Sequence, residues 1–140
     1  MAVMEGGRQS LWVRSLDTPD PQQLAGTDGA AFPFWSPDSR FIGFFAAQGK
    51  LKKIAATGGP PQTLCDASGG RGATWGRDGV ILFCPSPGSV SHRVSSAGGV
   101  PSPVTDSKTT GGGQHRFPWF LPDGRHSLFV APGLRPRSAA

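Results

Sequence analysis

The chain alternates short apolar runs with clusters of glycine, proline and small polar residues. Between residues 31 and 65 this pattern predicts four β-strands, at about 31–35, 40–46, 50–56 and 61–65. Each run is rich in Phe, Trp, Ile, Val or Leu and is bounded by turn residues. Because no long stretch shows a period of 3.6 residues, we expect almost no helix.

The same pattern recurs along the chain with a period of 40 residues. Asp38 and Asp78 occupy equivalent places in turns that follow a large aromatic residue and precede an apolar strand. A third turn of this kind contains Asp123, 45 residues after Asp78, and the five additional residues fall in the loop at 106–115. A second set of equivalent positions is also spaced by 40 residues: Leu11, Leu51 and Ser91. An insertion confined to a loop leaves such a repeat intact.

Four short strands in each period of about 40 residues are typical of a β-propeller blade. The sequence therefore predicts an all-β fold of four-stranded antiparallel blades, about three in number, in an open or incomplete ring. We expect a half blade with the last two strands at 1–27, whole blades at 28–67 and 68–107, a half blade with the first two strands at 108–133, and a disordered tail at 134–140.

Propellers typically have 4–8 blades, so about three blades do not close a ring within one chain. Sheet edges at 9–16 and 125–131 are therefore expected to be unpaired, and such edges invite pairing with another chain. Two copies, each lending its terminal strands to the other, would make six blades with twofold symmetry. The alternative is that the chain is a fragment of a larger protein.

The turns and third strands resemble those of the TolB-type, WD-repeat-like propeller family. Residues 35–40 (Trp-Ser-Pro-Asp-Ser-Arg) are similar to the family's Trp-Ser-Pro-Asp-Gly turn, and residues 11–16 resemble a third strand that begins Leu-Trp. The middle repeat departs from the pattern with Gly76-Arg77 in place of Ser-Pro. The resemblance covers roughly residues 8–131 and is greatest to propeller regions that follow the kinase domain of some bacterial serine/threonine kinases. It implies a sensor or interaction surface without identifying a ligand.

Composition and charge narrow the function classes. The 21 glycines and 14 prolines lie between the apolar runs, and 36% of residues are hydrophobic, which disfavours a disordered chain. The net charge is +5, but the basic residues are scattered, and only Lys50, Lys52 and Lys53 cluster in the body of the chain. Scattered positive charge is typical of a solvated surface and disfavours a nucleic-acid partner.

No apolar stretch approaches the roughly 18 residues of a membrane helix, and no signal peptide is visible. The compartment stays open, because a larger parent protein could carry the chain to any compartment.

The repeated residues have a structural interpretation. Asp38, Asp78 and Asp123 are expected to bond nearby backbone in their turns, rather than to bind metal or act in catalysis. The aromatic residues three positions earlier are expected to pack between blades: Trp35, Trp75 and Phe120. Cys65 and Cys84 end apolar strands and are expected to be small buried hydrophobes. No catalytic, metal-binding or cofactor-binding motif is present in the sequence.

A binding surface is expected on the loops that join the last strand of one blade to the first strand of the next. The longest of these loops carries the candidate binding residues Lys108, Gln114, His115 and Arg116. We therefore expect a non-catalytic binding or scaffold module with a protein or peptide partner. The alternative is the regulatory sensor portion of a bacterial serine/threonine kinase whose catalytic domain is absent from this chain.

Overall fold

In the computed structural model, which describes residues 2–5, 8–105 and 115–131, every regular element in these ranges is a β-strand. The strands are β1 (Ala2–Glu5), β2 (Arg8–Val13), β3 (Gln22–Gln23), β4 (Ala31–Trp35), β5 (Phe41–Ala46), β6 (Lys50–Ala55), β7 (Gln62–Asp66), β8 (Ala73–Trp75), β9 (Val80–Phe83), β10 (His92–Ser95), β11 (Ser102–Pro103), β12 (Arg116–Phe120) and β13 (Ser127–Val130). The four strands expected between residues 31 and 65 are confirmed.

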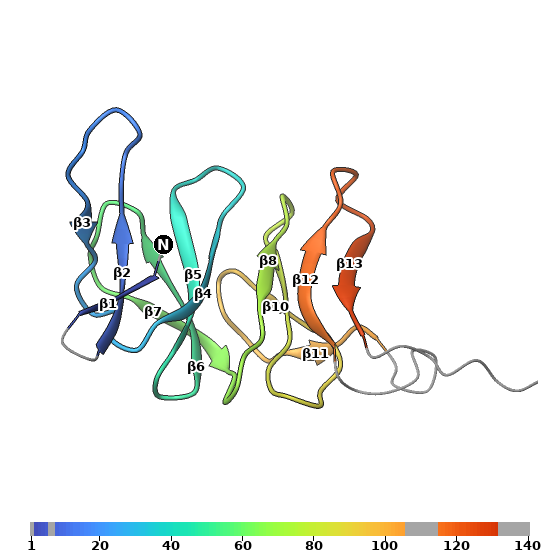
Figure 1. Ribbon diagram of the computed structural model, residues 1–140. Helices are drawn as coiled ribbons and strands as arrows, with labels where there is room; N and C mark the ends of the chain where they lie inside the picture. Colours follow the sequence, from blue (N-terminus) through green and yellow to red (C-terminus); the bar gives the residue numbers. More distant parts are fainter. Residues whose placement is uncertain (1, 6–7, 106–114, 132–140) are drawn as a thin grey trace, which may run out of the picture.

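The strands form four antiparallel sheets that stand side by side in chain order (Figure 1). The second sheet, β4-β5-β6-β7, and the third sheet, β8-β9-β10-β11, each have four strands in sequential order. The first sheet, β1-β2-β3, and the fourth sheet, β12-β13, are incomplete. The expected fold class, an open array of propeller blades, is therefore confirmed.

The first sheet differs from the expected half blade because β1 is a third strand. β1 pairs with β2 in the register Ala2↔Leu11 to Glu5↔Arg8. The edge near residues 9–16, which the sequence predicts to be unpaired, is thus covered along β2. The backbone N–H and C=O groups on a free strand edge need hydrogen-bond partners, and the short segment before β2 supplies them here. The four residues of β1, AVME, are too few for the sequence pattern alone to predict a strand.

The hydrophobic core lies between neighbouring sheets. Ile42 and Phe44 of β5 face the first sheet and pack in one cluster with Leu11, Leu24 and Ile54. The alternate residue Phe45 belongs to a second cluster, shared with the third sheet, whose other members include Phe34, Leu51, Leu64, Ile81, Phe83 and Val94. Because successive side chains of a strand point to opposite faces, β5 is apolar throughout and fills both junctions.

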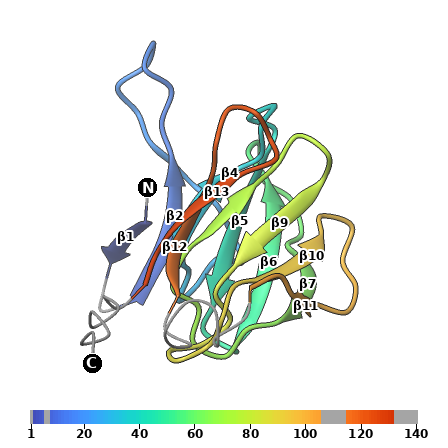
Figure 2. The ribbon, with the colours of Figure 1, turned by 90° about the vertical axis from the view of Figure 1, so that its right-hand side faces the viewer.

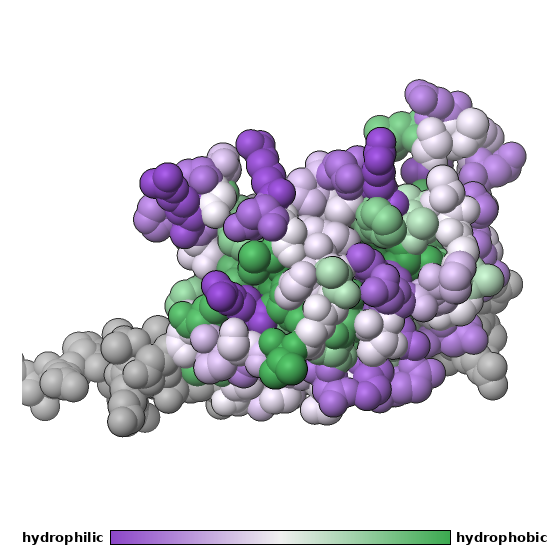
Figure 3. All heavy atoms as spheres, turned by 180° about the vertical axis from the view of Figure 1, so that it is seen from behind, coloured by the Kyte–Doolittle hydropathy of each residue, from purple (hydrophilic) through white to green (hydrophobic). Residues whose placement is uncertain are grey.

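Most of the surface of the projecting turns is hydrophilic, whereas hydrophobic residues gather between them on the body of the molecule (Figure 3). Within the described residues there is no helix long and apolar enough to span a membrane.

Candidate functional site

The first strand of each of the last three sheets borders one groove. These inner strands, β4, β8 and β12, lie next to one another, with β8 between the other two (Figure 1). In Figure 2 the array is viewed from the end at which β12 and β13 lie. A pocket of about 430 Å³ spans all three strands, and a second of about 200 Å³ adjoins it. We call the two together the inner-strand groove; its main lining residues are Phe32, Pro33, Trp35, Arg77, Phe117 and Trp119.

Two phenylalanines in the groove have an uncommon backbone conformation. Phe32 has φ 49° and Phe117 has φ 52°, in the left-handed region that bulky side chains rarely occupy. Both stand at irregularities of the pairing, between Ala31 and Phe34 and between Arg116 and Trp119. A β-bulge re-aims a side chain, so these two bulges place aromatic rings in the groove at a conformational cost.

The two rings meet across the intervening sheet. The ring centroids of Phe32 and Phe117 are 6.0 Å apart, in a tilted arrangement. The residue at the equivalent position of the third sheet is Gly72, with φ 99°. A Cβ atom on Gly72 would stand 3.0 Å from the Cα atom of Phe117, so glycine is what lets the second ring approach. Both phenylalanine side chains stay partly exposed to solvent.

The three repeated aromatic residues are not equivalent in their surroundings. Trp75 is partly buried against the core between the second and third sheets, as expected. Trp35 is 49% exposed, because in the described part of the chain the first sheet has no inner strand beside it. Within the described residues Trp35 therefore does not lie between two sheets, unlike the expectation for this position. Phe120 is half-buried, and its backbone N–H donates to the Thr74 Oγ1 at 3.3 Å.

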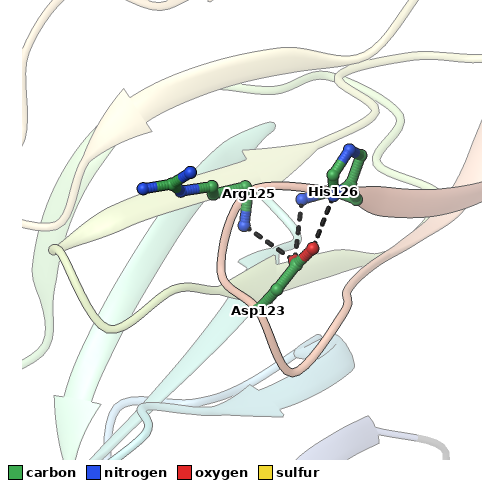
Figure 4. Close-up of polar contacts among 3 residues, drawn as sticks. All are labelled: Asp123, Arg125 and His126. Atoms are coloured by element: carbon green, nitrogen blue, oxygen red, sulfur yellow. Dashed lines mark hydrogen bonds and ion pairs between the residues drawn. The ribbon is translucent and has the colours of Figure 1, made fainter.

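Two of the three repeated aspartates organise their turns. The Asp38 carboxylate accepts hydrogen bonds from the Ser36 hydroxyl at 2.6 Å and the Arg40 N–H at 3.0 Å. The Asp123 carboxylate accepts from the Arg125 and His126 N–H groups and pairs with the His126 ring (Figure 4).

These bonds favour the ionised carboxylates. Hydrogen bonding from Ser36 and Arg40 lowers the pKa of Asp38, and hydrogen bonding from His126 and Arg125 lowers the pKa of Asp123 to about 2.

The turn that contains Asp78 is built differently. Gly76 replaces the serine, and the N–H of Gly76 bonds the Val80 carbonyl, four residues on. In the other two turns the corresponding bond spans five residues, from Ser36 N–H to Phe41 O and from Leu121 N–H to His126 O. The middle turn is therefore one residue shorter, which the 40-residue spacing of Asp38 and Asp78 does not reveal.

The candidate binding loop is only partly described. Lys108 and Gln114 lie outside the described residues. Arg116 begins β12 and is exposed. His115 is buried instead of lying on the surface, because its ring stacks on Phe129 of β13 with centroids 4.3 Å apart.

His115 holds the third and fourth sheets together through a neutral ring. Its Nδ1 atom accepts from the Ser91 N–H at 3.3 Å and lies 2.9 Å from the Thr105 Oγ1. Burial lowers the pKa of His115 below the ordinary value near 6.5, because desolvation disfavours the charged imidazolium.

Acidification is therefore expected to destabilise the chain through His115. Below the unfolded-state pKa of about 6.5, the imidazole binds a proton more readily in the unfolded chain than in the folded chain. The stability that the neutral, buried His115 ring contributes is therefore complete above that pH and is lost as the pH falls. Urea unfolding at pH 7.5, 6.5 and 5.5 measures the loss. His115→Gln should flatten this dependence while His92→Gln, as the control, keeps it; equal slopes in wild type and His115→Gln would contradict the assignment.

The two cysteines have the expected environment. Cys65 and Cys84 are both buried and unpaired with each other. Burial raises the pKa of the Cys65 thiol to about 11 and also raises the pKa of Cys84, so both remain protonated near neutral pH. In the described part of the chain, no three His, Cys, Asp or Glu side chains gather in a way that could hold a metal ion.

The sequence pattern did not predict that Phe32 and Phe117, at the two bulges, would line a groove. Phe32 and Phe117 occupy equivalent repeat positions, and each precedes a proline. That shared Phe-Pro pair is the signal that could have identified them.

Comparisons with known proteins support the fold. No family model matches the chain, and no curated protein matches it. Among solved structures, a protein described as TolB from Agrobacterium tumefaciens has a TM-score of 0.75 at 20% identity, over 89% of this chain and 46% of that chain. TolB from Acinetobacter baumannii has a TM-score of 0.74 at 17% identity, over 99% of this chain and 35% of that chain.

The chain thus spans less than half the length of either TolB structure. At these identities the likeness establishes a TolB-like β-propeller fold. The comparisons give no support to the kinase-linked alternative.

Proposed function

We propose that the chain is a non-catalytic binding module whose inner-strand groove holds an extended segment of a protein partner. The observation that carries this proposal is the pair of exposed phenylalanines, Phe32 and Phe117, at strained positions. A left-handed conformation at a non-glycine residue costs on the order of 1–3 kcal/mol, and such strain clusters at functional sites. Gly72 shows that this fold accommodates a glycine at the same position without that cost.

The chemistry of the groove favours a peptide with apolar side chains and a carboxylate. Aromatic and proline residues line most of it, and Arg77 supplies a guanidinium. Aromatic residues, phenylalanine included, and arginine are enriched at protein interfaces, and tryptophan and arginine often contribute most of the binding energy. The net charge of +5 also favours the approach of an acidic segment.

The hydroxyl groups that line the groove form hydrogen bonds within the fold, which suits a binding site better than a catalytic site. The Ser36 hydroxyl donates to Asp38 and accepts from the Phe41 N–H, so it serves the turn. The Thr74 Oγ1 accepts from the Phe120 N–H. Neither hydroxyl has a neighbouring imidazole in the groove lining that could act as a general base.

A selection from displayed random linear peptides tests the proposal. Peptides selected on the wild-type chain should be enriched in apolar residues and Asp or Glu. Their affinity, measured by fluorescence anisotropy, should fall about tenfold or more in Phe117→Gly, which is about 1.4 kcal/mol of binding free energy. Stability should change little, because the Phe117 ring is half exposed and the relief of backbone strain offsets the packing that it provides.

Val100→Gly is the matched control, since Val100 is an exposed apolar residue outside the groove. It should leave the affinity of the selected peptides unchanged. Peptides that bind Phe117→Gly and Arg77→Ala as tightly as wild type would refute a role for the groove.

A further inference from the structure

A further pocket adjoins the inner-strand groove at the junction between the second and third sheets. It has a volume of about 290 Å³, and we call it the junction pocket. Its main lining residues are Asp38, Phe41, Lys53, Trp75, Arg77 and Ser96. Trp75 and Arg77 also line the groove, so the two spaces meet at these residues. All six residues belong to the two complete sheets or to their turns, so the incomplete sheets at either end of the array do not form these walls.

Lys53 holds its ammonium group at the wall of the junction pocket. The Nζ atom lies 5.2 Å from the centroid of the Phe41 ring and 6.0 Å from that of the Trp75 ring. It donates one hydrogen bond to the Ser96 carbonyl of the third sheet at 2.6 Å. An ammonium group has three N–H donors, and the other two have no hydrogen-bond partner in the described part of the chain. A positive charge is thus fixed in place with donors left for a ligand.

Arg77 stands where the repeat otherwise has a proline. In each of the three turns that contain the repeated aspartates, the N–H of the fourth residue bonds the carbonyl of the first. The second position of such a turn favours proline, and Pro37 and Pro122 occupy it in the other two turns. The Arg77 side chain is exposed and forms no ion pair or hydrogen bond within the described ranges. The middle turn therefore gives up a turn-forming residue and gains a guanidinium between the groove and the junction pocket.

The charges around the junction pocket favour a ligand with a single negative charge. Lys53 and Arg77 supply two positive charges, and the ionised Asp38 supplies one negative charge. The Asp38 carboxylate accepts hydrogen bonds from its own turn and pairs with neither cation. One positive charge therefore remains, which suits a carboxylate. A doubly charged phosphate would be repelled by Asp38 without a third cation to compensate.

We propose, on the basis of the proposed function of the groove, that the junction pocket is its carboxylate-binding subsite. Lys53 and Arg77 hold the side chain of an Asp or Glu residue that belongs to the extended partner segment. A carboxylate has two acceptor oxygens, so it can accept from both cations at once. Hydrogen bonds between ionised groups are about twice as strong as those between neutral groups.

The position of the junction pocket identifies the source of the carboxylate. A segment that lies in the groove can extend a side chain into the pocket where the two spaces meet, at Trp75 and Arg77. The ring centroids of Phe41 and Trp75 are 6.2 Å apart, and these rings form an apolar wall for the methylene groups of that side chain. The groove then supplies apolar contact, and a small number of placed polar groups in the junction pocket supplies specificity.

Lys53→Met gives the main test, since it removes the charge but keeps an unbranched stem against Phe41 and Trp75. The probes are selected peptides that lose affinity in Phe117→Gly and contain one Asp or Glu, made with an amidated C-terminus. Each is compared with a version in which Asn or Gln replaces the acid. In Lys53→Met the acidic peptides should bind about tenfold or more weakly, and the amide versions should lose less than about twofold.

Two further variants separate the subsite from general effects of charge and folding. Arg77→Gln should give the same pattern as Lys53→Met, and its exposed, unpaired side chain can be changed without disturbing the fold. Lys52→Met is the matched control, because it removes the same charge from the neighbouring residue, on the opposite face of β6 and outside both spaces. It should leave both peptide forms within about twofold of their wild-type affinity. Urea unfolding checks that each variant is folded.

The outcomes distinguish this subsite from the groove itself. If peptides depend on Phe117 but the acidic and amide forms lose equal affinity in Lys53→Met and Arg77→Gln, the subsite is wrong and the proposed function stands. If no peptide depends on Phe117, the proposed function fails and the subsite fails with it. Peptides that bind only with a free C-terminal carboxylate, or more tightly with phosphoserine in place of the acid, would also overturn the assignment to an Asp or Glu side chain.

Discussion

Phe44→Ala is expected to lower the free energy of unfolding by about 3–5 kcal/mol, the usual cost of truncating a buried phenylalanine. The Phe44 side chain is fully buried between the first and second sheets, with Leu11 and Ile54 in the same cluster. Truncation removes apolar packing from both sheets and leaves a cavity that rigid strands fill poorly. Urea unfolding at neutral pH, monitored by far-ultraviolet circular dichroism, measures the loss. Because the total free energy of unfolding of a small domain is about 5–15 kcal/mol, the variant should be close to unfolding at physiological temperature.

Trp35→Ala is the control for this prediction. The Trp35 ring is larger but half exposed, so its truncation should cost clearly less than that of Phe44. A larger loss in Trp35→Ala than in Phe44→Ala would mean that the core does not lie where the buried clusters place it.

Gly43→Ala is expected to destabilise the chain by about 1–3 kcal/mol through overpacking. Gly43 is the cross-strand partner of Phe34, whose ring lies directly over it. A Cβ atom on Gly43 would stand 2.1 Å from the Phe34 Cζ, so the ring would have to leave its place against Trp75. Thermal unfolding compared with wild type measures the effect.

A double-mutant cycle isolates the clash. Phe34→Leu removes the ring at some cost of its own, but Gly43→Ala added to it should then cost much less than in the wild-type background. If the two losses simply add, the destabilisation by Gly43→Ala comes from the backbone, and the contact with the ring is unimportant.

The sequence determined the content of each sheet, because the four strands of a blade are neighbours along the chain. Hairpin pairing depends on short apolar runs and turn residues, both of which repeat every 40 residues. The turns of Asp38 and Asp123 likewise form within a few residues, through side-chain bonds to nearby backbone. Local interactions of this kind are visible in a single sequence.

The candidate site depended on contacts that the repeat does not encode. Phe32 and Phe117 are distant in sequence, and their rings meet only because the inner strands of successive sheets lie side by side. The bulges that expose them depend on the register between strands. His115 looked like a loop residue, but it is buried because β13 folds back over it.

Burial at equivalent repeat positions was decided by the tertiary structure alone. Trp35 and Trp75 have the same place in the repeat, yet among the described strands only Trp75 has an inner strand of a preceding sheet beside it. Leu82 and Leu128 pair with the equivalent residues Thr74 and Trp119 of their inner strands, yet Leu82 is buried and Leu128 is exposed. A strand pattern specifies which side chains face a neighbouring sheet, because side chains alternate along the strand. Whether a neighbouring sheet is present is a property of the assembled array, since each sheet's apolar faces are buried only by the sheets beside it.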